Sequence, residues 1–200
     1  MAGTITVEMG EIWVSHCPDE RLVAVGLGAC LGVCLYDPQA RVAALAHVVL
    51  PQTPPHPTLF RGQVVPSLPG KCADTAIAAL ISRSVERGAA AHNLRAALAG
   101  GAQIFSPTPT PAAPGGGGGA SLSRLEIGPR NTVAVRDALA AEGIAVLAED
   151  VGGHCGRTLT LCVRTGEVLV RRIGAHEQTL ACLGLPHSPV TLERAVAHEL

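Results

Sequence analysis

Cysteine and histidine are the residues of this sequence best suited to nucleophilic chemistry, and one pair of them stands out. Cys30 ends the glycine-rich segment GLGAC at 26–30, and His47 lies in the next apolar stretch. A thiol that contacts an imidazole can pass its proton to the ring, and the resulting ion pair lowers the thiol pKa from about 8.5 toward neutrality. Such a thiolate attacks a carbonyl carbon to form a thioester, which water then hydrolyses.

A β-hairpin is the element expected to position this pair. Segments 30–36 and 41–47 are largely apolar, and the residues DPQA between them at 37–40 are typical of a turn. If an even-numbered loop is centred on this turn, Cys30 lies directly opposite His47. Directly opposed residues on an antiparallel ladder share a face, with Cβ atoms about 4.5–5.5 Å apart. A loop of odd length would send the two side chains to opposite faces.

The residue pattern of the two arms supports the even-numbered loop. One face of the hairpin is then wholly apolar, with Leu31, Val33, Leu35, Val42, Ala44, Ala46 and Val48. The other face is mixed, with Cys30, Gly32, Cys34, Tyr36, Arg41, Ala43, Leu45 and His47. The sequence therefore predicts a core face and a second face that carries the thiol and the imidazole.

The glycines before Cys30 also bear on the chemistry. Attack on a carbonyl produces a tetrahedral oxyanion, which needs backbone N–H donors. Gly26 and Gly28 allow a sharp bend just before the nucleophile. The backbone amides of Ala29 and Cys30 are therefore the expected oxyanion donors.

Other interpretations of these residues stay open. Spacing alone also fits a cysteine and a histidine that simply fill the core. The glycines form GxGxxxG rather than GxGxxG and precede an expected strand, which disfavours a dinucleotide site. Cys30 and Cys34 match no zinc-ligand spacing, so no structural metal is expected.

Composition excludes several functional classes. The 200 residues include 48% hydrophobic residues but only one Trp, one Tyr and two Phe, so stacking on nucleic-acid bases is not expected. The 15 basic and 16 acidic residues are dispersed, which disfavours a nucleic-acid surface. No apolar run approaches membrane-spanning length, and the N-terminus lacks the pattern of a secretion signal. We expect a cytoplasmic protein whose seven cysteines are free thiols.

Strands dominate the expected secondary structure. Besides the hairpin, strands are predicted at 4–8, 12–15, 21–26, 93–105, 144–150, 157–164 and 167–173. Helices are predicted at 71–88 and at 130–143, the second with Asn131 as its N-cap. Strands in hairpins with single helices favour an α+β fold over a regular βαβ repeat.

The expected domain organisation is simple. Residues 1–173 are predicted to form a single domain. The Pro- and Gly-rich segment 106–123 is expected to be a flexible insertion within it, and residues 174–200 a C-terminal tail.

Seven short motifs, in order along the chain, resemble the CheD family of chemoreceptor glutamine deamidases. They are GLGAC at 26–30, LYD at 35–37, AHVVLP at 46–51, KCAD at 71–74, GGAQIF at 100–105, IGPRN at 127–131 and DVGGHCGR at 150–157. The family usually has GLGSC in place of GLGAC and an aromatic residue in place of Cys72.

This resemblance implies a function and a fold. Cys30 would be the nucleophile and His47 its base, in hydrolysis of glutamine side-chain amides on methyl-accepting chemotaxis receptors. The fold would be a layered sandwich of mixed and antiparallel sheets with flanking helices, similar to the catalytic domain of cytotoxic necrotising toxins. A CheC-type phosphatase is an implied partner, and no cofactor is implied.

Further residues are site candidates. Ala24 stands where the family usually has a threonine that orients the histidine, so a backbone carbonyl near Ala24 is expected to accept the imidazole N–H instead. Gly28 and Arg157 are candidates for contact with substrate. A structural ion pair is the alternative for Arg157, and structural roles are favoured for Asn131 and Asp150.

Three functions are consistent with these residues. The first is a protein-glutamine glutaminase that acts through a Cys30 thioester. The second is a non-catalytic or weakly catalytic chemotaxis module that binds receptors or a phosphatase. The third is a receptor methylesterase, because the same thioester path serves both leaving groups.

Overall fold

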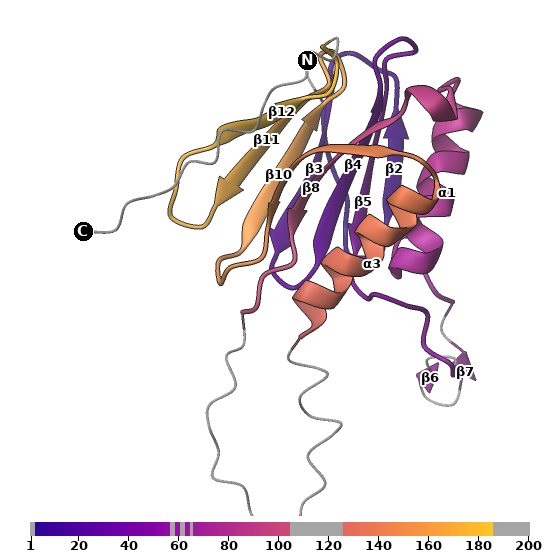
Figure 1. Ribbon diagram of the computed structural model, residues 1–200, viewed down its shortest axis with the longest axis vertical. Coiled ribbons are helices and arrows are strands. Elements are labelled where there is room, and N and C mark those ends of the chain that lie inside the picture. Colours follow the sequence, from indigo (N-terminus) through magenta and orange to yellow (C-terminus); the bar gives the residue numbers. More distant parts are fainter. Residues whose placement is uncertain (1–2, 57–58, 61–62, 65, 105–125, 186–200) are drawn as a thin grey trace, which may run out of the picture.

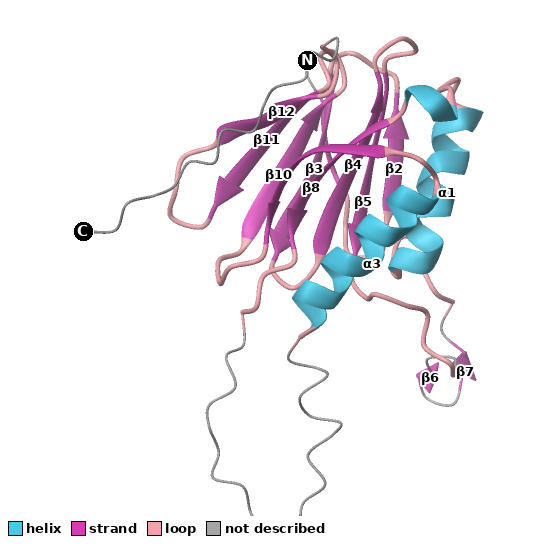
Figure 2. Cartoon of the chain, in the orientation of Figure 1, coloured by secondary structure: helices cyan, strands magenta, loops and turns pink. Residues whose placement is uncertain are grey.

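The computed structural model describes residues 3–56, 59–60, 63–64, 66–104 and 126–185. The insertion expected at 106–123 and residues 186–200 of the expected tail lie outside this range. Within it, two five-stranded sheets and two long helices make up most of the chain (Figures 1 and 2). The expected α+β class with mixed sheets is confirmed.

The first sheet contains strands from both ends of the described chain. In spatial order its strands are β1 (Gly3–Thr6), β3 (Glu20–Leu27), β10 (Arg157–Cys162), β11 (Glu167–Arg172) and β12 (Gln178–Cys182). β1 and β3 are parallel, and the other pairings are antiparallel. β12 lies in the segment expected to be a tail, so the sheet continues past the domain boundary predicted at residue 173.

The second sheet holds the predicted hairpin at its centre. In spatial order its strands are β2 (Ile12–Ser15), β5 (Val42–Val48), β4 (Leu31–Asp37), β8 (Arg95–Gly100) and β9 (Ala145–Val151). β8 and β9 are parallel and are connected through a helix, so one βαβ unit is built into an otherwise antiparallel arrangement. A short hairpin of β6 (Leu59–Phe60) and β7 (Gln63–Val64) stands apart from both sheets in Figure 1.

Two helices cover one face of the second sheet, and the first sheet covers the other (Figure 1). The helices are α1 (Ala73–Glu86) and α3 (Ile127–Ala141), with a 3-10 turn η1 at Ala91–Asn93. The central layer therefore has two apolar faces, and every residue of β4 and β5 is buried. The face predicted to be mixed is thus also a core face, because Cys34, Tyr36 and Leu45 pack against the first sheet.

The helix after the insertion begins earlier than predicted. α3 begins at Ile127, with Glu126 as its N-cap, so Asn131 is an interior residue of the helix and not its cap. Pro129 does not prevent this start, because proline is tolerated in the first turn, where its missing N–H has no intrahelical partner. No helix of the described residues is both long enough and apolar enough to cross a membrane.

Candidate active site

The hairpin forms as predicted, but with a different register. The β4–β5 ladder pairs Gly32 with His47 and ends with Leu31 opposite Val48. The prediction that Cys30 lies directly opposite His47 is therefore wrong. Because the register differs by two positions rather than one, the side chains keep the faces that were predicted for them.

The turn explains the difference. Asp37 pairs with Val42, which leaves residues 38–41 as the loop. The Asp37 carboxylate accepts hydrogen bonds from the amides of Gln39 and Ala40 at 2.8 and 3.1 Å. This Asx turn makes Asp37 the last residue of the strand and moves the centre of the loop toward the C-terminus.

Cys30 and His47 both face the layer between the two sheets, near the end of the β4–β5 ladder. Had the ladder continued by one pair, Cys30 would face Val49 and His47 would be its diagonal neighbour, a relation that spans about 7–8 Å. The Cys30 side chain is half-buried against the apolar cluster between the two sheets, and His47 projects toward the same layer as Leu45. Within the described residues no hydrogen bond joins the thiol to the imidazole, so the structure contains the neighbourhood but not the contact.

His47 is held in one orientation by a backbone carbonyl. Its Nδ1 lies 3.2 Å from the Val7 carbonyl oxygen, and the residue is 2% exposed. Nδ1 must therefore carry the proton, since the carbonyl can only accept, and Nε2 keeps its lone pair. Nε2 is buried and has no partner among the described residues. This tautomer is the one that a general base needs.

The acceptor for His47 is the carbonyl of Val7 and not that of Ala24 itself. The amide of Val7, just after β1, donates to the Val23 carbonyl on the neighbouring strand, so Val7 lies beside Ala24. Ala24 itself is fully buried in the core between the sheets. Val7, which follows the neighbouring strand β1, therefore supplies the carbonyl that the sequence led us to expect near Ala24.

Burial keeps both reacting groups neutral in the resting protein. Desolvation raises the pKa of the Cys30 thiol, although its own backbone amide partly opposes this. Desolvation lowers the pKa of His47, against opposing effects of the Val7 carbonyl and Glu8. These two directions oppose the thiolate–imidazolium pair expected from the sequence, which stays a prediction. Proton transfer to His47 would have to accompany attack on a substrate.

The turn that carries Cys30 is fixed through its carbonyl groups. The Gly28 carbonyl accepts from the Ala102 amide at 2.7 Å, and the Cys30 carbonyl accepts from the Gly101 amide at 2.8 Å. The Ala29 carbonyl accepts from the Asn131 side chain at 2.9 Å. In contrast, within the described residues the amides of Ala29 and Cys30 donate to no backbone carbonyl. Both amides are therefore available as the oxyanion donors predicted from the sequence, although the Cys30 amide also faces its own thiol.

Close packing on the segment GGAQI at 100–104 explains two of its features. Gly100 has φ +117°, and a Cβ there would lie 2.3 Å from the Cys30 carbonyl oxygen, so a larger residue would displace the nucleophile turn. The half-exposed Ile104 side chain lies directly over Gly28, where a Cβ would be 2.1 Å from its Cδ1. Gly28 thus lets an apolar side chain approach the site, whereas its predicted contact with substrate stays a prediction.

Asn131 is the residue that sequence reasoning assigned incorrectly. The residue is fully buried, and its side-chain amide donates to the carbonyls of Ala29 and Val49 at 2.9 and 3.0 Å. It therefore connects the Cys30 turn to the chain just after His47. The IGPRN motif contained the signal for this role, but an asparagine near the start of a helix favoured the capping interpretation.

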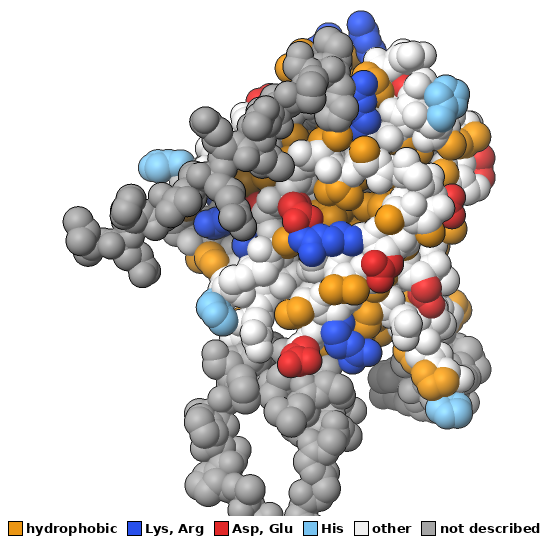
Figure 3. All heavy atoms as spheres, viewed as in Figure 1, with side chains coloured by type: hydrophobic (Ala, Val, Ile, Leu, Met, Phe, Trp, Pro, Cys, Tyr) orange, Lys and Arg blue, Asp and Glu red, His pale blue; other side chains and the backbone are white. Residues whose placement is uncertain are grey.

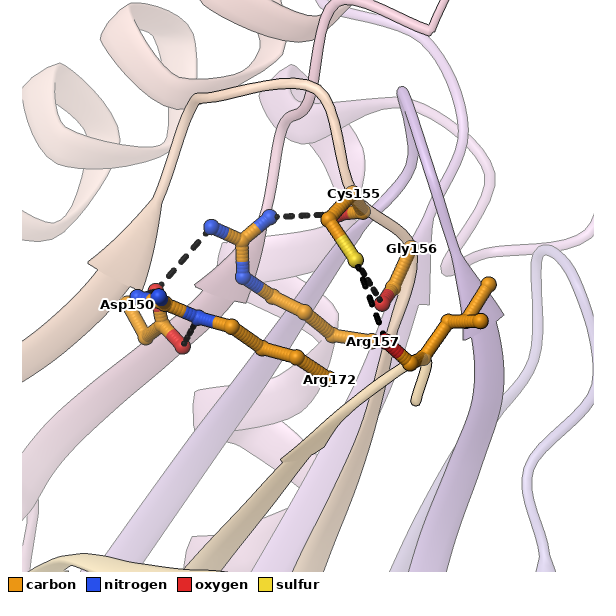
Figure 4. A network of polar contacts seen from close by, with 6 residues as sticks. Asp150, Cys155, Gly156, Arg157 and Arg172 are labelled. Atoms are coloured by element: carbon orange, nitrogen blue, oxygen red, sulfur yellow. Dashed lines mark hydrogen bonds and ion pairs between the residues drawn. The ribbon is translucent and has the colours of Figure 1, made fainter. Parts of the chain in front are cut away.

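Arg157 lies in a buried ion cluster, as the structural alternative predicted. It is 4% exposed and donates to Asp150 at 3.0 Å and to the Cys155 carbonyl at 2.9 Å. Arg172 donates to the same carboxylate at 2.7 and 3.0 Å (Figure 4). Burial acts to raise the pKa of Asp150, but the hydrogen bonds from Arg172 and Arg157 outweigh it and hold this pKa below its usual range. Two of the three guanidinium nitrogens of Arg157 are thus occupied, and Nε has no partner among the described residues. The predicted contact of Arg157 with substrate stays a prediction.

The face of the molecule in Figure 3 shows no concentration of one charge among the described residues. On the face in Figure 3, acidic and basic side chains are interspersed among apolar ones. Within the described residues, no three His, Cys, Asp or Glu side chains gather as they would around a metal ion.

Comparisons with known proteins identify the family of this chain. The family model described as CheD chemotactic sensory transduction matches residues 55–172. A probable chemoreceptor glutamine deamidase CheD of Symbiobacterium thermophilum is 43% identical over 87% of this chain and 95% of its own length. The chemoreceptor glutamine deamidase CheD of Thermotoga maritima is 38% identical over 86% of this chain and 94% of its own length.

One solved structure gives a weaker likeness. A hypothetical protein YfiH of Bacillus licheniformis has a TM-score of 0.38 and 14% identity, over 70% of this chain and 51% of that one. This value is too low to support an argument about fold or function. The sequence relatives suffice for classification, and the chain belongs to the CheD family.

Proposed function

We propose that this chain is a chemoreceptor glutamine deamidase that converts glutamine side chains of methyl-accepting chemotaxis receptors to glutamate and releases ammonia. The observation that carries the proposal is the match to relatives with this name over nearly their whole length, at 38–43% identity. The geometry around Cys30 and His47 supports it independently, because it provides a thiol, a correctly oriented base and two available backbone amides.

The proposed reaction begins with two neutral partners. As the Cys30 sulfur attacks the amide carbon of the substrate, His47 Nε2 accepts the thiol proton. The carbonyl oxygen becomes an oxyanion and is stabilised by the amides of Ala29 and Cys30. The Val7 carbonyl stabilises the imidazolium through Nδ1–H, because it offers a lone pair to the ring as the positive charge develops.

Collapse of the oxyanion releases the nitrogen. The C–N bond breaks, His47 returns the proton to the leaving group, and ammonia departs from a thioester on Cys30. Water then loses a proton to His47 and adds to the thioester carbon. The C–S bond breaks, the thiol is regenerated, and glutamate is released.

This reaction requires the Cys30 sulfur to come nearer to His47 than it is in the resting structure. Cys30 is the end of a turn and not part of the ladder, so a modest side-chain rotation moves its sulfur without breaking strand pairing. Catalytic hydrogen bonds in unliganded enzymes are often long and tighten when substrate binds.

The experiment uses a purified receptor cytoplasmic fragment. We expect the wild-type protein to release ammonia and to give the mass gain that accompanies each conversion of an amide to a carboxylate. Cys30→Ala should show neither. The proposal fails if the wild type gives no mass gain, or if Cys30→Ala gives as much.

Methanol release from a methylated fragment tests the esterase alternative in the same assay, because only the leaving group differs. Receptor binding without any conversion would instead indicate the binding module. An interaction with a CheC-type phosphatase and a likeness to the cytotoxic necrotising toxin catalytic domain belong to the same proposal, as does a cytoplasmic location. The phosphatase interaction is tested by co-purification of the two proteins.

A further inference from the structure

The β4–β5 ladder ends just before the candidate site, and its two chains then separate. Among the described residues, no ladder pair holds them together beyond Leu31 and Val48. The amides of Val49 and Leu50 both donate to the Lys71 carbonyl at 2.9 Å, whereas the Cys30 carbonyl accepts from Gly101. The chain that carries the thiol and the chain that follows the imidazole are therefore drawn toward different parts of the molecule.

The side chain of Asn131 spans this separation. One nitrogen, Nδ2, donates to the Ala29 carbonyl on one chain and to the Val49 carbonyl on the other. The orientation of the amide is unambiguous, because two carbonyl oxygens can be satisfied only by its NH2 group. The Asn131 oxygen accepts no hydrogen bond among the described residues. Asn131 therefore acts here through the two N–H donors of its amide group.

The helix that carries Asn131 cannot easily move away. At Gly128 a Cβ would lie 2.5 Å from the Ala102 carbonyl oxygen and 2.6 Å from that of Gly101, which shows how tightly α3 packs on this segment. The Gly101 and Ala102 amides in turn hold the carbonyls of Cys30 and Gly28. The first turn of α3 and the nucleophile turn are therefore fixed to the same stretch of chain.

Peptide geometry connects Asn131 to the oxyanion donors. In a trans peptide the C=O and the following N–H point in opposite directions, and the structure contains no cis peptide among its described residues. The bond from Asn131 to the Ala29 carbonyl thus directs the Cys30 N–H away from the helix. The bond from Ala102 to the Gly28 carbonyl fixes the Ala29 N–H in the same way.

We propose that Asn131 is a positioning residue for catalysis: by holding the Ala29 carbonyl it aims the Cys30 N–H at the oxyanion, and by holding Val49 it keeps the nucleophile turn in place beside the His47 strand. The inference rests on the proposed deamidase function. It assigns to a buried helical side chain a role that acts through a backbone amide and not through contact with substrate.

The test compares two reactions of the same thiol. Acetylation of Cys30 by p-nitrophenyl acetate proceeds through an oxyanion: the S–C bond forms, p-nitrophenolate leaves, and the thiol proton is lost to the base. Alkylation by iodoacetamide displaces iodide at carbon and forms no oxyanion. Both rates are measured at Cys30 itself by peptide mass spectrometry, so the other six thiols do not contribute.

Asn131→Ala and Asn131→Asp are expected to lower the ratio of acetylation to alkylation at least about tenfold, since removal of one oxyanion donor costs about 10²–10³ in rate and misdirection costs part of that. Asn131→Ser, which keeps a single donor, should give an intermediate ratio. Thr132→Val is the matched control, because Thr132 is the next buried residue of α3 and, among the described residues, its hydroxyl donates to Gly128 at 3.1 Å and to no atom of the Cys30 turn. Its ratio should equal that of the wild type.

The readouts separate positioning from general stability. Circular dichroism melts establish that each variant is folded at the assay temperature. If a folded Asn131→Ala keeps the wild-type ratio, or if its two rates fall in parallel, the proposal is overturned. Because the assay needs no receptor, a wild type that acetylates normally but does not deamidate receptors would overturn the proposed function and leave this inference standing.

Discussion

Two polar regions flank the segment 100–104, and they differ in how far their polar atoms are paired by hydrogen bonds. On one side, among the described residues, His47 Nε2 has no partner and the amides of Ala29 and Cys30 donate to no backbone carbonyl. On the other side the Asp150 carboxylate accepts three hydrogen bonds from Arg157 and Arg172. The carbonyl of Gly100 accepts the Gly152 amide at 2.9 Å, so the same segment contacts both regions.

The difference distinguishes a site from a structural support. A buried polar atom without a partner costs about 1–3 kcal/mol, so a protein keeps several together only where a ligand will satisfy them. In the ion cluster the buried charges of Asp150 and Arg157 are paired with each other, although Arg157 Nε has no partner among the described residues, so the cluster has less to offer a ligand. The ion cluster joins β9 of one sheet to β10 and β11 of the other, and it anchors the loop that reaches the site.

The largest effect should come from the base. His47→Gln retains a polar side chain but has no basic nitrogen, so receptor deamidation should fall about 10²–10⁴-fold. The melting temperature should change little, because the loss of one hydrogen bond to Val7 costs about 1 kcal/mol. Initial rates of ammonia release and thermal melts measure the two effects. A variant that unfolds but keeps its specific activity would contradict the distinction drawn here.

The second prediction is the reverse of the first: a large loss of stability with little loss of activity. Asp150→Ala leaves the buried Arg157 unpaired and should lower the free energy of unfolding by about 3 kcal/mol, at the lower end of the range for buried pairs because Arg172 is half-exposed. Urea unfolding measures this loss. The kcat of the folded fraction should stay within a few-fold of wild type.

Glu149→Ala is the matched control for Asp150→Ala. Glu149 is the preceding residue of β9 and pairs with Arg136 at the surface, where both side chains are partly exposed. Its removal should cost at most about 1 kcal/mol. Equal losses from the two variants would show that the cluster is not a structural support.

The third prediction concerns pH. Because burial raises the pKa of Cys30, its thiol should stay protonated at pH values where an exposed thiol has already ionised. The rate of iodoacetamide alkylation at Cys30 should therefore still rise with pH where that of N-acetylcysteine levels off. A plateau near neutral pH would instead show a preformed ion pair with His47.

The same shift has a consequence for stability, and its sign is fixed. A thiol with a raised pKa in the folded state contributes stability that is fully present below the unfolded pKa and is lost as pH rises through the folded pKa. Wild type should therefore lose stability at alkaline pH more steeply than Cys30→Ala. Urea midpoints of the two proteins across this pH range provide the measurement.

Sequence reasoning reached the hairpin and its faces because alternation of side chains is a local property. It missed the register because the Asp37 side chain decides where the strand ends, and its preference is satisfied only in the folded loop. A register error of two positions leaves every side chain on its predicted face, so the Cys30–His47 neighbourhood survived the error.

The roles of Asn131 and Arg157 depend on residues far away in sequence. Nothing local to Asn131 shows that the carbonyls of Ala29 and Val49 will meet it, 102 and 82 residues away. Likewise the partners of Arg157 are determined by how two sheets meet. The pattern of a single segment does not show which distant segment it will contact in the fold. The partners of Asn131 and Arg157 therefore could not be predicted from their own motifs.

The smallest effect is expected at Ala24. A threonine there supplies the hydroxyl that the family pattern leads one to expect, yet Nδ1 of His47 already donates to the Val7 carbonyl. Ala24→Thr should therefore change kcat less than about threefold, equivalent to well under 1 kcal/mol of transition-state stabilisation. Overpacking of a fully buried position should meanwhile cost about 1–3 kcal/mol of stability.

Ala24→Val is the matched control for Ala24→Thr, because valine has the shape of threonine without its hydroxyl. Similar melting temperatures and similar kcat values for the two variants would show that volume alone matters at this position. If Ala24→Thr were instead more than about tenfold faster than Ala24→Val, a gain of about 1.4 kcal/mol, the hydroxyl would be supplying an acceptor that the Val7 carbonyl does not. The Val7 carbonyl alone would then not be enough to fix the orientation of the His47 ring. The lack of a partner for Nε2 would in that case reflect an imperfectly oriented base, and not only a position kept for substrate.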